Sequence, residues 1–512
     1  MTTRAPLETE IKLAATPDML VALREHPLLA GPDHTSALVT RYFDTADRRM
    51  AQAGASLRVR KTGQAREQTI KLPARTDSIV VRGEWTVPAL GETPDIGAFS
   101  EEPRAALEKL LDDEPLLAFA ETRIERTTRR ITQGPAEIEI AFDHGEIHAG
   151  TMIAAVCELE LELVSGTLAD LLDLALALPL GPDLQWSVAG KSGRALALAD
   201  GATPSAIHAA PAGVSRDMAA GQAFQAIAWS CLSHLLENAA LVVATGDPEA
   251  VHQCRVAIRR LRAGLGLFGA LFADDAQAEV LDAEFKAAAN ATGPARDTQV
   301  LLDRLCAVPG SHEAGPAELV AHVRSVVDKA TASTQALLAG PAFQALLFQL
   351  ALWIERGDWL NHAHDADRPL PRFAAHALRK RRRKIRRMGD DPATMTVEQR
   401  HVLRIAVKKL RYAADFFAPL YPSKSGEKAQ RRFGSAAAKV QDRLGELHDL
   451  DVLAAGREAL FVGLEPIGAA RLSAQLDELI PSLAAPHPKL LKRTTKALAR
   501  LDTCKPWWKA DL

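Results

Sequence analysis

Five residues near the start of the chain, Glu8-Thr9-Glu10-Ile11-Lys12, have the types and the spacing of a charged binding site. In an extended strand alternate side chains share a face, so Glu8, Glu10 and Lys12 point the same way. Burying these charges without partners is costly, so this face predicts a wet, charged cavity. Paired carboxylates can hold a hard cation such as Mg²⁺, and a neighbouring lysine can hold a phosphate. A solvated edge strand with mixed charge would show the same motif.

Further segments of the first 200 residues alternate between apolar and charged side chains. They are residues 57–60, 69–72, 80–87, 137–143 and 158–163. The charged positions among them include Asp143, Glu158, Glu160, Arg58, Arg60, Lys71 and Arg82; Glu84, Glu137, Glu139 and Glu162 are also charged. An antiparallel sheet with one solvated face would also alternate, but it explains less well why arginines fill the polar face. A closed barrel with a charged interior explains both signs, because carboxylates cluster on a metal and guanidinium groups surround a polyanion.

Length and composition set the class of protein. A chain of 512 residues is too long for one ordinary core, so we expect two or three domains. It is 47% hydrophobic and 25% charged, as in soluble globular proteins, and no stretch reaches the roughly 18 uninterrupted apolar residues of a membrane span. The five cysteines are scattered and form no C-x-x-C pair, which indicates reduced thiols. These features predict a cytoplasmic protein that does not associate with membranes.

Charge is distributed unevenly along the chain, although its net value is only −2. Residues 1–200 hold 21 Lys and Arg against 31 Asp and Glu, a charge of −10; residues 201–512 hold 41 against 33, a charge of +8. This asymmetry predicts a cation site in the first part and an anionic partner for the second. Residues 200–217 are rich in Ala, Gly and Pro, which predicts a linker, and Ala- and Leu-rich helical patterns follow it.

The order of the strand motifs resembles that of CYTH domains, the triphosphate tunnel metalloenzymes. The motifs are Glu8-x-Glu10-x-Lys12, Tyr42-Phe43-Asp44-Thr45, Leu57-Arg58-Val59-Arg60, Thr69-Ile70-Lys71, Arg82-Gly83-Glu84-Trp85, Phe142-Asp143-x-Gly145 and Glu158-Leu159-Glu160-Leu161-Glu162. The resemblance covers about residues 5–200. It implies an eight-stranded antiparallel tunnel that binds triphosphates with Mg²⁺ or Mn²⁺. Relatives include inorganic triphosphatases, thiamine triphosphatases and class IV adenylyl cyclases.

The resemblance also implies roles for individual residues. The implied metal ligands or water-positioning carboxylates are Glu8, Glu10, Asp143, Glu158 and Glu160. The implied phosphate clamps are Lys12, Arg58, Arg60, Lys71, Arg82 and Lys191, and the implied catalytic residues are Glu8, Glu10, Lys12 and Lys191. One more arginine is expected from residues 122–129; Arg123 and Arg126 face opposite ways in a regular strand, and we favour Arg126. Direct attack by water is expected, with no serine or cysteine nucleophile.

The second half contains an internal repeat of basic residues. His252-x-x-Arg255-x-x-x-Arg259-Arg260-Leu261-Arg262 recurs as His401-x-x-Arg404-x-x-x-Lys408-Lys409-Leu410-Arg411. On a helix, offsets of 0, 3, 7 and 10 fall within roughly 80°, so each copy presents one basic stripe. A single stripe is usually a solvated face, but two in register indicate a duplicated helical bundle with a binding role. The stripes contain almost no aromatics, which disfavours a nucleic-acid site.

The repeat resembles the CHAD domain over about residues 217–505. This resemblance implies two four-helix bundles around a basic groove that binds inorganic polyphosphate. The implied contacts are His252, Arg255, Arg259, Arg260, Arg262, His401, Arg404, Lys408, Lys409 and Arg411. We expect His252 and His401 to gain positive charge as the pH falls toward about 6, so binding should tighten there.

Together these observations predict an α+β protein with two domains. The tunnel domain spans residues 1–200, the linker 201–216 and the helical domain 217–505. We expect metal-dependent hydrolysis of inorganic triphosphate to pyrophosphate and phosphate by residues 1–200, and polyphosphate binding by the helices. Hydrolysis or cyclisation of an organic triphosphate (a nucleotide or thiamine triphosphate) remains an alternative, as does a polyphosphate-binding protein without catalysis. The sequence leaves open the choice between Mg²⁺ and Mn²⁺, the oligomeric state and any communication between the domains.

Overall fold

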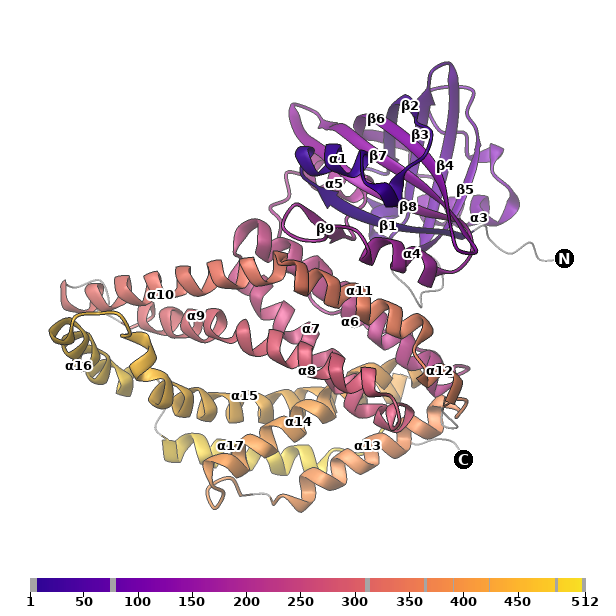
Figure 1. Ribbon diagram of the computed structural model, residues 1–512. Helices are drawn as coiled ribbons and strands as arrows, with labels where there is room; N and C mark the ends of the chain where they lie inside the picture. The colour runs from indigo at the N-terminus through magenta and orange to yellow at the C-terminus, as the bar shows by residue number, and fades with distance from the viewer. Residues whose placement is uncertain are drawn as a thin grey trace. The chain divides into compact units, whose positions relative to one another are not determined.

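The computed structural model describes residues 7–73, 80–308, 314–362, 366–389, 391–422, 424–483 and 487–508 (Figure 1). Residue contacts divide the chain into two compact units. The first contains Met1–Ile207, Leu232–Asp247 and Ala336–Gly357. The second contains His208–Cys231, Pro248–Gln335 and Asp358–Leu512. The first unit therefore includes a helical segment that lies far beyond the strands in sequence.

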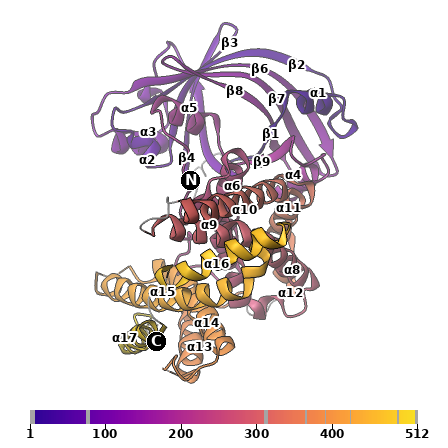
Figure 2. The ribbon, with the colours of Figure 1, turned by 90° about the vertical axis from the view of Figure 1, so that its left-hand side faces the viewer.

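Antiparallel strands of the first unit close into a barrel (Figure 2). The strands are β1 (Leu7–Ala15), β2 (His34–Asp44), β3 (Ser56–Thr62), β4 (Ala65–Pro73), β5 (Val81–Pro88), β6 (Leu117–Gln133), β7 (Ala136–Ala149), β8 (Met152–Ser165) and β9 (Leu184–Ser187). Their order is β5-β4-β3-β2-β6-β7-β8-β1-β9, and pairing of β5 with β1 closes the first eight strands. The ninth strand lies beside β1. The predicted eight-stranded antiparallel barrel is confirmed.

Alternation along the strands separates the two faces of the barrel wall. Ile11 and Leu13 of β1 have no exposed surface, while Glu10 and Lys12, which alternate with them, are charged. On β3 and β4, the outward apolar side chains of Leu57 and Ile70 pack against α2 (Arg49–Gln52) and α3 (Glu101–Leu111). The apolar face thus lies under helices, and the charged face is left for the interior.

Two further helices brace the barrel. The helix α5 (Lys191–Ala199) packs through Ala195 against a cluster that includes Tyr42 and Ile124. Its first residue, Lys191, is buried. The helix α4 (Leu168–Leu176), which a Thr167 capping box starts, packs on β1, β7 and β8 from the outside. These contacts fix the strands that carry the charged motifs.

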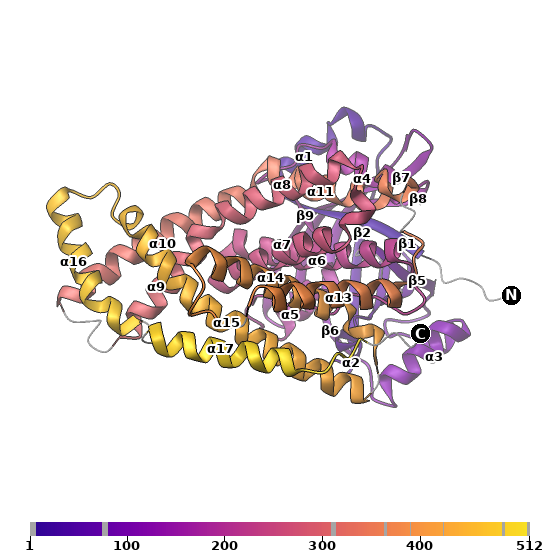
Figure 3. The ribbon, with the colours of Figure 1, turned by 90° about the horizontal axis from the view of Figure 1, so that it is seen from below.

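After the linker the described chain is helical, as the sequence predicts. The helices are α6 (Ala220–Thr245), α7 (Pro248–Leu267), α8 (Ala276–Ala291), α9 (Gly293–Cys306), α10 (Ala314–Ala339), α11 (Pro341–Arg356), α12 (Trp359–His362), α13 (Leu370–Arg387), α14 (Val397–Phe417), α15 (Lys424–Leu460), α16 (Pro466–Leu483) and α17 (His487–Thr503). In the second unit α13 packs on α14, α14 on α15 and α15 on α17 (Figure 3). The helices α7 and α14, which contain the two copies of the repeat, also pack against each other.

Two apolar segments meet the length and composition of a membrane span. They are α6 and, taken together, the bent pair formed by residues 317–339 of α10 and by α11. In α6, 67% of the apolar window is buried inside the protein, which is the pattern of a helix in a packed core.

Candidate active site

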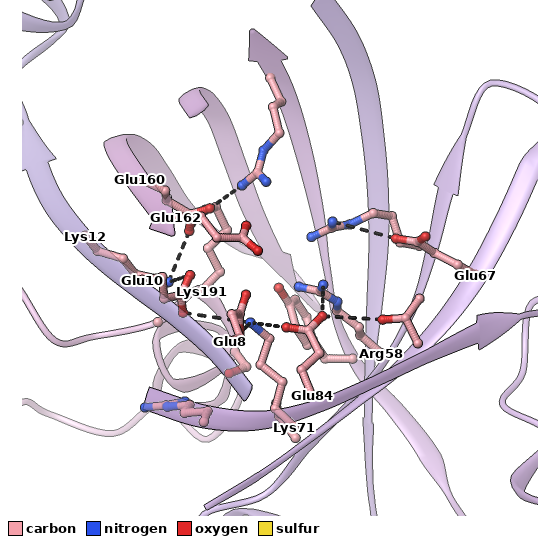
Figure 4. Close-up of a pocket in the computed structure, with 18 of the residues that line it drawn as sticks. Glu8, Glu10, Lys12, Arg58, Glu67, Lys71, Glu84, Glu160, Glu162 and Lys191 are labelled. Atoms are coloured by element: carbon pink, nitrogen blue, oxygen red, sulfur yellow. Dashed lines mark hydrogen bonds and ion pairs between the residues drawn. The ribbon is translucent and has the colours of Figure 1, made fainter. Parts of the chain in front are cut away.

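The interior of the barrel holds a charged cavity of about 560 Å³ (Figure 4). Inward-pointing strand residues and the start of α5 supply its wall. The predicted site residues on this wall are Glu8, Glu10, Lys12, Arg58, Arg60, Lys71, Arg82, Arg126, Glu160 and Lys191. A smaller cavity of about 270 Å³ adjoins it and shares Arg60, Glu67 and Thr86. The charged face of the strands thus lines the interior.

Strand register explains which side chains meet. Residues directly opposite each other on antiparallel strands share a face of the sheet. Lys12 of β1 lies opposite Glu160 of β8, and Lys71 of β4 lies opposite Glu84 of β5. The Lys12 ammonium is 3.4 Å from a Glu160 carboxylate oxygen, and the Lys71 ammonium is 3.0 Å from Glu84. The ion pairs therefore follow from the hydrogen-bond register.

Three buried carboxylates, from Asp143, Glu158 and Glu160, form a cluster beside the cavity. Asp143 lies opposite Glu158 across β7 and β8, and one oxygen from each of the three side chains lies within 4.8 Å of the other two. The Lys191 ammonium is 2.5 Å from Asp143 and 2.9 Å from Glu160, and it also donates to Glu158. Burial disfavours charge on Lys191, but the three carboxylates outweigh that effect and raise its pKa.

Arginines complete the surroundings of this carboxylate cluster. Arg126 donates to Asp143 through Nε at 2.7 Å and through Nη2 at 2.6 Å, and it also donates to Glu160. Arg194, on α5, donates to Glu158 at 2.9 Å. The Arg126 side chain is 15% exposed, whereas that of Arg123 is 64% exposed. Of the two arginines, the structure therefore places Arg126 on the cavity wall.

The carboxylate cluster has the donor chemistry of a divalent-cation site. Mg²⁺ and Mn²⁺ prefer carboxylate oxygens, and a carboxyl group must be ionised to bind them. Burial disfavours ionisation of Glu160, but Lys12, Lys191 and Arg126 outweigh it and hold its pKa well below the usual range. Three convergent carboxylates, one held ionised in this way, therefore fit a hard divalent cation.

Glu8 and Glu10 belong to a second acidic group on the same wall. The Lys71 ammonium lies 2.5 Å from Glu8 and 3.8 Å from Glu10. Burial, a hydrogen bond with Glu84 and the charge of Glu10 raise the pKa of Glu8. Burial also disfavours charge on Glu84, but the hydrogen bond with Glu8 and the charges of Lys71 and Arg58 outweigh it and lower its pKa. The structure thus splits the five predicted metal ligands into two groups.

The predicted set leaves out two residues that the structure brings into the site, Glu84 and Arg194. Glu84 lines the cavity and lies 3.3 Å from Arg58. Its signal in the sequence is its position two residues after Arg82 on one strand face. Arg194 follows Lys191 by three residues, the spacing of neighbours on a helix surface. Glu139 and Glu162 also line the cavity.

The second unit contains a separate group of cations where α7 meets α14. Burial and the charges of Arg404, Arg259, Arg411 and Arg255 lower the pKa of Lys408 to about 7. Because two of these arginines come from each helix, the two basic stripes converge. Burial is the largest cause of the low pKa of Lys408, and the four arginines add a positive potential in the same direction.

Other members of the predicted groove have different surroundings. Arg255 donates to the Ala289 carbonyl at 2.5 Å and so holds the end of α8. Arg262 pairs with Asp282 at 2.8 and 3.0 Å. Arg260 is 5% exposed; its guanidinium lies 5.5 Å from the centre of the Phe416 ring. The Arg260 side chain is therefore packed away from the stripe.

The remaining groove residues are His252, His401 and Lys409. Burial and the charges of neighbouring arginines lower the pKa of His252 to about 4. The expectation that His252 gains charge near pH 6 is therefore wrong for the protein without a bound anion, because burial and the neighbouring arginines oppose that charge. The His401 ring lies 4.9 Å from that of His448. Burial and the charges of Arg381, Lys384 and Arg262 lower the pKa of Lys409, so it belongs to a cation group that extends to α13.

Comparisons with known proteins agree with both parts of the chain. The CYTH domain model matches residues 6–180, and the CHAD domain model matches residues 226–457. An inorganic triphosphatase from Haemophilus influenzae is 28% identical over 197 residues, which are 36% of this chain and 53% of that protein. The match therefore spans about half the length of that curated relative.

Two solved structures each match a little more than half of this chain. The CHAD domain from the plant Ricinus communis is 26% identical, with a TM-score of 0.49, and the match covers 58% of this chain and 97% of that one. PptA from Streptomyces chartreusis is 16% identical, with a TM-score of 0.36, and the match covers 56% and 98%. The two family models carry the assignment: this chain belongs to the CYTH–CHAD proteins, with a CYTH tunnel domain followed by a CHAD domain.

Proposed function

We propose that the tunnel hydrolyses inorganic triphosphate to pyrophosphate and phosphate with Mg²⁺ or Mn²⁺. The observation that carries this proposal is the cavity of about 560 Å³, which is lined by many cations and by Glu160, one of the three clustered carboxylates. The 28% identity to an inorganic triphosphatase supports the same substrate. Tyr42 is the sole aromatic side chain among the described residues of the cavity wall, which favours a substrate without a base.

The residues divide the chemical work by charge. Asp143, Glu158 and Glu160 would hold the cation, which when bound neutralises phosphate charge and acidifies or positions water. Lys12 and Arg60 face the same cavity and would hold phosphate oxygens, stabilising the charge that develops during transfer. Attack by water requires no covalent intermediate on the protein.

Lys191 is placed to respond to the substrate. It begins α5 at the cavity wall together with Gly190 and Ser192, so the positive end of that helix borders the same cavity. Its three carboxylate partners keep it charged, as their effect on its pKa indicates. We therefore assign Lys191 to phosphate binding or to stabilisation of the leaving group.

We further propose that the helical domain binds inorganic polyphosphate where α7 meets α14. The chain of negative phosphates would neutralise the charges of the four arginines, which together with burial lower the pKa of Lys408. Arg259, Lys408 and Arg411 are the expected direct contacts, while Arg260 and Arg255 stabilise the fold.

The five cysteines are free, which supports a reducing compartment such as the cytoplasm.

One assay separates the candidate functions. Phosphate release is measured from inorganic triphosphate, ATP, thiamine triphosphate and long-chain polyphosphate, each with Mg²⁺ and with Mn²⁺. We expect the highest kcat/KM for inorganic triphosphate. A higher kcat/KM for ATP or thiamine triphosphate would indicate that the tunnel acts on an organic triphosphate. No phosphate release from any of the four compounds would favour a binding protein without catalysis.

A further inference from the structure

The short strand β9 pairs with β1 of the barrel, from the last residue of the E-x-E-x-K motif onward. The register pairs Lys12 with Ser187 and Leu13 with Trp186. The backbone N–H of Trp186 does not point to β1; it donates to the Gln344 side-chain oxygen at 3.1 Å. A residue 158 positions away in sequence thus caps the outer edge of this strand.

Gln344 is held so that its amide can make this contact. It lies on α11 and is 3% exposed, and its Nε2 donates to the Leu338 carbonyl at 2.9 Å. The donor and the acceptor of the amide are both used, which fixes its orientation. Leaving a buried amide or N–H without a hydrogen bond would lower the stability of the fold. The Trp186 N–H, the Gln344 amide and the Leu338 carbonyl therefore hold one another in place.

Aromatic packing reinforces the same contact. The indole of Trp186 stacks on Phe348 of α11, with ring centroids 4.2 Å apart and an interplanar angle of 12°. Phe348 has no exposed surface and lies four residues after Gln344, on the same helix face. At the far end of α11, Arg356 donates to Asp173 of α4 at 2.7 Å. The helix is therefore fastened to β9 and to α4 along its length.

The strand that α11 supports carries the charged motif of the tunnel. From Gln344 the contacts run through Trp186 to Leu13 of β1. The neighbouring Lys12 reaches Glu160, a member of the carboxylate cluster. We propose that α11, a helix within the stretch matched by the CHAD model, is a working part of the tunnel, and that Gln344 and Phe348 are positioning residues for Glu10 and Lys12.

This inference extends the proposed function and changes what the tunnel domain contains. The CYTH model ends at residue 180, before β9 and far before α11. The sequence predicts that residues 1–200 suffice for catalysis. A fragment of those residues would lack Phe348, on which the Trp186 indole stacks, and Gln344, which accepts from the Trp186 backbone N–H. Activity of the tunnel then depends on how α11 is held, which gives the helical region an influence on catalysis.

The test compares two glutamines of α11 in the full chain. Gln344→Met keeps the volume and removes both hydrogen bonds, while Gln349→Met changes an exposed glutamine of the same helix and is the matched control. Hydrogen exchange of the β9 and β1 amides is measured, together with kcat and KM for inorganic triphosphate well below the unfolding temperature. We expect Gln344→Met to speed exchange in β9 and β1 at least about tenfold and to lower kcat about tenfold with a smaller change in KM.

The two readouts keep this inference separate from the proposed function. Wild-type exchange and kcat in Gln344→Met, with an active wild type, would overturn the inference. If the wild type releases no phosphate, the proposed function fails, and the exchange data still decide whether α11 holds β1. Phe348→Leu provides a second variant that keeps an apolar side chain, and it should shift exchange in the same strands.

Discussion

Arg60 lies where the two tunnel cavities meet, with Nε 3.3 Å from the Thr40 hydroxyl and Nη1 3.8 Å from Glu67. Burial and the charges of Arg58 and Arg126 lower its pKa to about 10, so a phosphate there would relieve a strong positive potential. Arg60→Ala should lower kcat/KM by about 2–3 kcal/mol, or roughly 30- to 150-fold. Arg60→Lys should recover part of the lost kcat/KM, because an ammonium keeps the positive charge but cannot make the two parallel hydrogen bonds of a guanidinium group.

Steady-state kinetics on inorganic triphosphate measure this loss. Arg123→Ala is the matched control, because Arg123 lies on β6 with its side chain 64% exposed and does not line the cavity. If Arg60→Ala and Arg123→Ala are equally efficient and both fold, Arg60 does not contact the substrate.

Lys408 offers a prediction about pH. Its pKa of about 7 is far below the ordinary lysine value because of burial and the arginines around it. A bound polyanion favours the charged form, so binding takes up a proton, and affinity should rise as the pH falls from about 8 to 6. Lys408→Met should flatten this dependence in a polyphosphate titration at several pH values. A slope that survives in Lys408→Met would assign the proton to another group, such as His252, because a bound polyanion would neutralise the arginines around it.

The same shift affects folding stability with a definite sign. Between about pH 7 and 10.5, Lys408 is largely neutral in the folded protein and charged in the unfolded chain. The unfolded state then binds more protons, so this group makes the protein more stable as the pH rises through that window. Lys408→Met should therefore stabilise the protein at pH 7 more than at pH 10. Equal gains at both values, measured by chemical denaturation, would show that Lys408 is charged in the folded state.

At the scale of elements, the pairing of β6 with β7 depends on a glycine. A Cβ on Gly145 would lie 2.0 Å from the Arg123 carbonyl oxygen and 2.9 Å from the Ile124 Cα, both backbone atoms that cannot yield cheaply. Gly145→Ala should destabilise the protein by about 1–3 kcal/mol and shift the strands that carry Arg126 and Asp143. Thermal unfolding measures the effect.

Gly193 supplies the control. It lies inside α5, and no atom lies within 4 Å of a Cβ built there. Gly193→Ala should be neutral or stabilising by up to about 1 kcal/mol, because alanine favours the helix. If Gly145→Ala and Gly193→Ala unfold at the same temperature, β6 and β7 can move apart at Gly145 without loss of folding stability.

Strand alternation made the tunnel wall predictable from the sequence. Side chains two residues apart share a face, so the inward position of Glu8, Glu10 and Lys12 follows once β1 is recognised. The division of the carboxylates into two groups depends on register between strands, which local periodicity does not contain. The contact between Trp186 and Gln344 joins residues 158 positions apart, and no local pattern predicts it. Likewise, Arg260 sits in a basic motif but packs against Phe416, because the tertiary fold decides which side of α7 faces solvent.

At the scale of the whole molecule, charge separates along the chain, with −10 in residues 1–200 and +8 in residues 201–512. We expect the helical domain to bind long-chain polyphosphate with an affinity that falls steeply as salt rises, because binding releases counterions. The triple variant Arg259→Glu, Lys408→Glu, Arg411→Glu should abolish this binding. The control reverses Lys489, Lys492 and Lys496, which are exposed on α17.

Titration of both triple variants in the full chain at several salt concentrations provides the comparison. Equal losses would indicate diffuse attraction to a basic surface rather than a site between α7 and α14. Tighter binding to duplex DNA or RNA than to polyphosphate would identify a nucleic-acid-binding domain instead.

The central claim is that the carboxylate cluster holds a divalent cation that the tunnel needs to cleave triphosphate. The most direct measurement is phosphate release from inorganic triphosphate as free Mn²⁺ or Mg²⁺ is varied, for the wild type and for Glu160→Gln. Glu160→Gln keeps the shape of the side chain and removes one charge from the cluster. We predict no release in excess chelator, saturation with metal in the wild type, and at least about a hundredfold loss in Glu160→Gln, the scale of one charged contact in a buried site. Full release in chelator, or a Glu160→Gln variant that matches the wild type at every metal concentration, would contradict the account.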